Sequence, residues 1–150
     1  MKTALSCLHS ARLIALLALA AAPASAALIT WSGAGADDNL ATPGNWFGDV
    51  VPVATDDVVF TGATRVTPIS TSQTFLSITF DSSASAFTLS GAALVTGTTT
   101  PSGGSVTNAS SFPQTFNCGF QPRVGTLLAS GGDVILNGGF NVGNGGNGTG

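Results

Sequence analysis

The clearest candidate strand in the chain is residues 74–80, with the sequence TFLSITF. Side chains alternate between the two faces of a β-strand, so Leu76, Ile78 and Phe80 are predicted to share one face and the residues between them the other. A strand this short buries little apolar surface by itself. It is therefore expected to stack against neighbouring strands.

Further short β-prone segments lie on both sides of this strand, separated by stretches of Thr, Ser, Gly and Ala. Gly and Pro residues between such segments are typical of turns. The candidates are residues 57–60, 65–67, 87–89, 93–96, 114–118, 126–129, 133–137 and 140–142. The pattern predicts an all-β fold. The close spacing favours a β-solenoid made of parallel strands, in which each coil covers the edge of the coil before it.

Two similar stretches support the stacking of coils. Residues 89–92 read Leu-Ser-Gly-Ala and residues 136–139 read Leu-Asn-Gly-Gly, which places Gly91 and Gly138 47 positions apart. With about 20 to 25 residues in one coil, this separation corresponds to two coils. An antiparallel β-sandwich is the alternative, because it also consists of many short strands and Asn137-Gly138 suits a hairpin turn.

The composition excludes several classes of protein. Only 7% of the 150 residues are charged, against about 25% in ordinary soluble domains. The 20 glycines and the many Ser and Thr residues argue against helical bundles and most α/β enzymes. The formal net charge is −3, so the chain lacks the electrostatic footprint of a nucleic-acid-binding protein.

The first 26 residues have the order of a secretory signal peptide. Lys2 and Arg12 precede an apolar run at residues 13–20, and a small-residue triplet follows at residues 24–26. Cleavage is expected between Ala26 and Ala27. The apolar run is shorter than the roughly 20 residues that span a bilayer. We therefore expect an exported protein with no transmembrane segment in its mature part.

Removal of the signal peptide restricts the available chemistry. The remainder has no Lys, Glu or His, and its two arginines face seven aspartates, a net charge of −5. Nucleophilic catalysis needs an activating base, which leaves Cys118 as a small buried hydrophobe by expectation. Loop aspartates at positions 37, 38 and 49 offer oxygen ligands for calcium, but no dedicated ligand spacing is visible. We expect no cofactor, no metal and no enzymatic activity.

Residues near the start of the mature chain resemble a known family. They are Trp31-Ser32-Gly33, Asn45-Trp46, Val51-Pro52 and the run from Asp56 to Phe60, and the likeness continues through most of residues 28–143. In these motifs the chain is similar to the start of autotransporter-associated β-strand repeat proteins. The resemblance implies a right-handed parallel β-helix on the outside of a Gram-negative-type cell. It implies no catalytic residues.

The predicted organisation has three parts. Residues 1–26 are the signal peptide, residues 27–60 a Trp-containing N-terminal cap, and residues 61–150 the first coils of a β-solenoid that is expected to continue beyond the chain end. Trp31, Trp46 and Phe47 have two interpretations. They cover the open first coil, as terminal repeats must be capped, or they form an exposed platform for sugar rings.

The function predicted from these features is mechanical. We expect an exported, non-enzymatic structural or adhesive protein, secreted or associated with the outer membrane, whose β-helix acts as a stalk. Its expected partners are surface glycans or other cell-surface proteins. The alternative is a carbohydrate-active or carbohydrate-binding β-helix, which would use Arg65 or Arg123 with calcium bound by aspartates.

Overall fold

The computed structural model describes residues 26–97, 104–123 and 125–140, and the predicted signal peptide therefore lies almost entirely outside the described residues. Within these ranges the chain is all-β, with one short 3-10 helix, η1, at Pro43–Asn45. The strands are β1 Leu28–Thr30, β2 Asp57–Phe60, β3 Ile69–Ser70, β4 Thr74–Phe75, β5 Ser77–Phe80, β6 Thr88–Gly91, β7 Leu94–Thr96, β8 Val106–Asn108, β9 Gln114–Phe116, β10 Phe120–Pro122, β11 Leu127–Ala129 and β12 Val134–Leu136.

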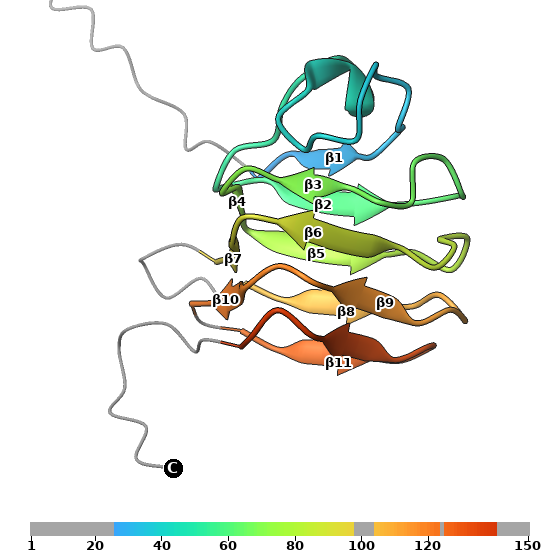
Figure 1. Cartoon of the computed structure of the whole chain (residues 1–150), viewed down its shortest axis with the longest axis vertical. Coiled ribbons are helices and arrows are strands. Elements are labelled where there is room, and N and C mark those ends of the chain that lie inside the picture. The colour runs from blue at the N-terminus through green and yellow to red at the C-terminus, as the bar shows by residue number, and fades with distance from the viewer. Residues whose placement is uncertain (1–25, 98–103, 124, 141–150) are drawn as a thin grey trace, which may run out of the picture.

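The strands form three parallel sheets that run alongside one another. Their orders are β1-β2-β5-β8-β11, β10-β7-β4 and β12-β9-β6-β3. The chain visits the sheets in turn, so that each circuit lies next to the previous one along a single axis (Figure 1). This is a β-helix-like arrangement and confirms the predicted all-β class. The antiparallel sandwich is wrong, because every pairing between the described strands is parallel.

The register of the sheets gives the length of a circuit. Asp57 pairs with Ser77 and Gln114 with Val134, so these circuits take 20 residues each. The internal similarity is confirmed as well. Leu89 pairs with Phe116 and Phe116 with Leu136, which places the two similar stretches two circuits apart.

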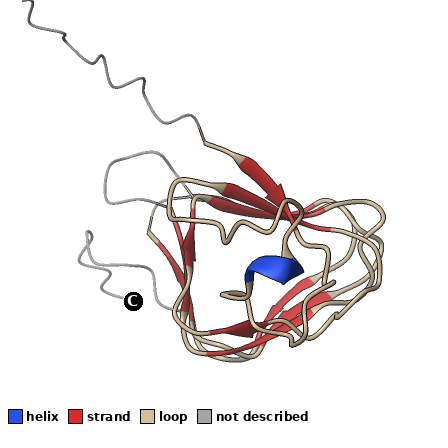
Figure 2. Ribbon diagram, turned by 90° about the horizontal axis from the view of Figure 1, so that it is seen from above, coloured by secondary structure: helices blue, strands red, loops and turns tan. Residues whose placement is uncertain are grey.

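Apolar side chains form continuous columns inside the three sheets (Figure 2). Val58, Ile78 and Val106 occupy paired positions in β2, β5 and β8, and each is at most 1% exposed. Phe60 and Phe80 form the next column, with their rings stacked at 5.2 Å. Burial of one such side chain contributes about 1.5–3 kcal/mol. The apolar columns therefore account for much of the stability of the stack.

The strand expected at residues 74–80 is divided by a corner. β4 ends at Phe75, the chain bends at Leu76, and β5 begins at Ser77 in a different sheet. Ile78 and Phe80 face the interior as predicted, but Leu76 is only half-buried and Phe75 is buried instead. The alternation rule holds within one strand, and the corner resets it.

Other strand predictions differ in detail. Residues 57–60 form β2 as predicted, whereas residues 65–67 form no strand, because Arg65 has a left-handed backbone with a φ of 46°. The sequence analysis missed β10, which ends in a proline. Phe140 makes a parallel bridge to Phe120, and the rest of the segment predicted at residues 140–142 lies outside the described residues.

Candidate functional site

The most distinctive part of the molecule is the connection between β1 and β2, residues 31–56, which we call the Trp segment. It lies over one end of the stack (Figure 1) and places η1 above the interior that the sheets enclose (Figure 2). Pro43 at the start of η1 sets the backbone for a helical turn. The segment therefore shields the apolar columns at this end from solvent.

Two tryptophans anchor the Trp segment in the interior. Trp31 and Trp46 are each 1% exposed, and their rings meet edge to face at 5.1 Å. Trp46 also packs against Phe60 and Phe75, at 6.0 and 5.9 Å between ring centroids. Its Nε1–H donates a hydrogen bond to the carbonyl oxygen of Leu40 at 2.9 Å, so the buried indole has no unpaired donor.

This burial differs from an exposed aromatic platform. Of the three aromatic residues considered for sugar binding, Trp31 and Trp46 present no ring face to solvent, and Phe47 alone is exposed, at 65%. The reason is energetic, since a buried tryptophan removes more apolar area from water than other side chains do. Sequence position alone did not distinguish these two environments.

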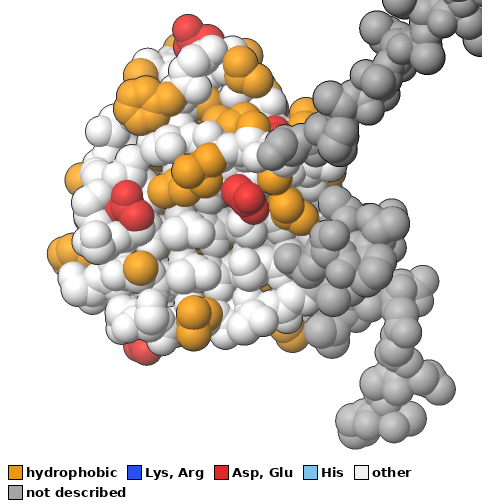
Figure 3. All heavy atoms as spheres, turned by 180° about the vertical axis from the view of Figure 1, so that it is seen from behind, with side chains coloured by type: hydrophobic (Ala, Val, Ile, Leu, Met, Phe, Trp, Pro, Cys, Tyr) orange, Lys and Arg blue, Asp and Glu red, His pale blue; other side chains and the backbone are white. Residues whose placement is uncertain are grey.

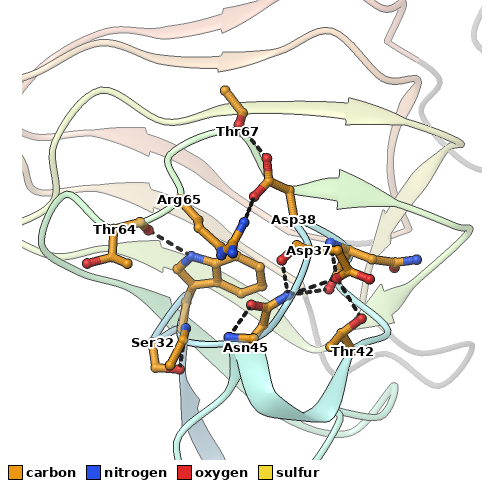
Figure 4. A network of polar contacts seen from close by, with 12 residues as sticks. Ser32, Asp37, Asp38, Thr42, Asn45, Thr64, Arg65 and Thr67 are labelled. Atoms are coloured by element: carbon orange, nitrogen blue, oxygen red, sulfur yellow. Dashed lines mark hydrogen bonds and ion pairs between the residues drawn. The ribbon is translucent and has the colours of Figure 1, made fainter.

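Asn45 is the polar centre of the Trp segment and was missed by the sequence analysis. It is fully buried, and its Nδ2 donates hydrogen bonds to the carbonyl oxygens of Asp37 and Asn39, each at 2.9 Å (Figure 4). Its Oδ1 accepts a hydrogen bond from the backbone N–H of Gly35 at 3.0 Å. A Cβ atom on Gly35 would lie 2.6 Å from that oxygen, so a glycine is required there.

An ion pair ties the Trp segment to the loop that follows β2. Arg65 Nη1 lies 2.8 Å from Asp38 Oδ1, and Thr67 Oγ1 donates a hydrogen bond to Asp38 Oδ2 at 2.9 Å (Figure 4). These hydrogen bonds, first that from Arg65 and then that from Thr67, lower the pKa of Asp38. The pKa of Asp37 is also lowered, chiefly by a hydrogen bond from Thr42 Oγ1.

These carboxylates predict how stability depends on pH. Their pKa values are lower in the folded chain than the ordinary value of 3.8, so their contribution is fully present above that value and is lost as the pH falls through the folded pKa. We expect the free energy of unfolding to fall between about pH 5 and pH 2. An Asp38→Asn variant should show a shallower fall in chemical denaturation. An identical pH dependence in both proteins would contradict this role of Asp38.

The described residues offer no assembled site for metal or catalytic chemistry. Within them, no group of three or more His, Cys, Asp or Glu side chains comes together. Asp37 and Asp38 engage neighbouring hydroxyl, amide and guanidinium groups. Cys118 is 2% exposed, and burial raises the pKa of its thiol, which makes it a poor nucleophile.

Most of the visible surface is uncharged. The face shown in Figure 3 consists mainly of backbone and neutral polar side chains, with isolated aspartates and scattered hydrophobic side chains. Nothing matches: neither protein-family models, nor curated proteins, nor solved structures are similar to this chain above the significance threshold. In the described part of the chain, no helix has the length and apolar character to cross a membrane. The functional argument therefore rests on the architecture.

Proposed function

We propose that this chain is an exported, non-enzymatic surface protein whose right-handed parallel β-helix acts as a stalk or adhesive scaffold. The observation that carries the proposal is the repeated circuit of about 20 residues, which joins three parallel sheets along one axis. Such a stack resists bending, because each circuit is bonded to the next by backbone ladders in every sheet. Its exterior loops would meet surface glycans or other cell-surface proteins.

The Trp segment would serve as the N-terminal cap of this stalk. A stack of repeats has apolar ends, and a terminal repeat must cover them. Trp31, Leu40 and Trp46 supply the apolar cover, and the hydrogen bonds of Asn45 hold the loop that carries them. The same features support membership in the family of autotransporter-associated β-strand repeat proteins.

The charge pattern supports a mechanical rather than a chemical role. Residues 27–150 contain no Lys, Glu or His, and Arg65 is engaged by Asp38. The Asp57 carboxylate accepts a hydrogen bond from Ser77 Oγ on the next circuit. Such contacts hold adjacent circuits together and leave no pair of carboxylates arranged for acid–base work among the described residues.

Export is tested by following the first 26 residues. Expressed in a Gram-negative host, the chain is expected to reach the periplasm or cell surface and to begin at Ala27, as measured by mass spectrometry of the intact protein. A matched variant, Leu16→Asp, breaks the apolar run and should remain unprocessed in the cytoplasm. Retention of the unmodified chain in the cytoplasm with residues 1–26 attached would contradict the proposal.

A further inference from the structure

The two ends of the stack differ in how they are covered. The Trp segment lies over the end formed by β1, whereas β11 and β12 are the last strands of their sheets and pair on one side only. We call this second end the open end and define it by the residues that continue the interior columns. They are Leu127, Ala129, Val134, Leu136 and Phe140.

The open end exposes side chains of the interior type. Leu127 continues the column of Ile78 and Val106, yet it is 45% exposed, and Phe140, which lies above Phe120, is 51% exposed. A cavity of about 110 Å³ opens among Val106, Phe120, Leu127 and Phe140. The apolar columns therefore reach the open end without the layer of side chains that would close them.

The backbone at the open end is equally unpaired. β11 and β12 each carry a row of N–H and C=O groups on the side away from their partners β8 and β9. An exposed edge of this kind pairs readily with another strand. Apolar side chains and free backbone groups are thus presented by the same surface.

The charge distribution favours a second copy of this chain as the occupant. Residues 26–81 contain six aspartates and Arg65, a net charge of −5, whereas residues 82–150 contain only Arg123 and Asp133. Both of these side chains are exposed on the last circuit. The open end is therefore neutral and carries one charge of each sign, so two copies meet there with the least mutual repulsion.

We propose that the open ends of two copies of this chain pair with each other and form a closed, two-fold dimer. The same surface is used by both copies, as in an isologous interface. Because the Trp segment covers the opposite end, a copy in the dimer has no second open end to offer. Association therefore stops at two chains and does not continue into a fibre.

The test is sedimentation of the full chain over a range of concentrations. The mass is expected to rise from one chain to two as the concentration increases, and Leu127→Asp should keep a single chain throughout because it places a charge in the contact. Val53→Asp is the matched control: Val53 is 59% exposed in the Trp segment, and its variant should dimerise like the unmodified chain. Residues 1–25 are common to all these proteins, so their contribution cancels.

A second variant avoids the risk that Leu127→Asp disturbs folding. Asp133→Arg changes only an exposed side chain and gives the open end two positive charges. It should weaken dimerisation by roughly tenfold at low salt, with recovery at high salt as the repulsion is screened. A single chain at every concentration would overturn the proposal. So would a dimer that Val53→Asp disrupts and both open-end variants leave intact.

Discussion

Replacement of Trp46 by alanine is expected to lower the free energy of unfolding by about 3–5 kcal/mol, as other large-to-small changes of buried aromatic residues do. The indole ring contacts Trp31, Phe60 and Phe75, and its N–H is bonded to the carbonyl oxygen of Leu40. Its removal leaves a cavity between the Trp segment and the first circuits of the stack. Denaturant unfolding followed by circular dichroism measures the loss.

Phe47 provides the control for this prediction. It is the next residue in the chain, but its ring is 65% exposed, so Phe47→Ala should change stability by no more than about 0.5 kcal/mol. Equal effects of the two substitutions would show that the buried position of Trp46 does not matter. A stable Trp46→Ala protein that had lost retention on a glycan column would favour the carbohydrate-binding alternative instead.

Replacement of Phe80 by alanine is expected to cost a similar amount, about 3–5 kcal/mol, for a different reason. The Phe80 ring is fully buried and contacts Phe60 on the preceding circuit at 5.2 Å and Phe116 on the following circuit at 6.1 Å. In a stack, stability depends on contacts between neighbouring circuits. Loss of this ring should therefore weaken the cohesion of three circuits at once.

Thermal and denaturant unfolding of Phe80→Ala should be compared with Phe112→Ala. Phe112 has the same side chain but is 50% exposed in a loop, and its carbonyl oxygen rather than its ring makes the contacts with Asn108 and Gln114. The control is expected to lie within about 0.5 kcal/mol of the unmodified chain. A Phe80→Ala protein as stable as the control would contradict the continuous apolar interior.

Some features of the fold could be predicted because they depend on local pattern. The alternation in residues 57–60 identified β2, and the similarity between residues 89–92 and 136–139 identified two positions in the same column. Both signals survive because a repeating circuit places like residues above one another. The direction of strand pairing followed from the short spacing, which leaves little room for long hairpins.

Other features depend on contacts that no local pattern encodes. The corner at Leu76 lies inside an unbroken alternating run, so nothing in residues 74–80 marks the change of sheet. The role of Asn45 depends on three backbone groups at residues 35, 37 and 39 that approach only when the loop is folded. The Asn-Trp pair and the preceding Pro-Gly marked a turn, but they did not show that its polar side chain is buried.

The burial of the two tryptophans shows the same limit. Trp31 and Trp46 are 15 positions apart and are brought together by a single antiparallel bridge between them. Whether such rings face solvent or the interior depends on the end of the stack beneath them. Phe60 and Phe75 supply that surface, and they belong to later parts of the chain.

The central claim is that successive circuits lie in parallel register, and nuclear Overhauser effects between methyl groups test it most directly. Val58, Ile78 and Val106 pair in series through β2, β5 and β8. Selectively labelled protein should therefore show contacts from Val58 to Ile78 and from Ile78 to Val106, with none from Val58 directly to Val106, two strand spacings of about 4.8 Å apart. Well-resolved methyl signals without the Ile78–Val106 contact would contradict the account.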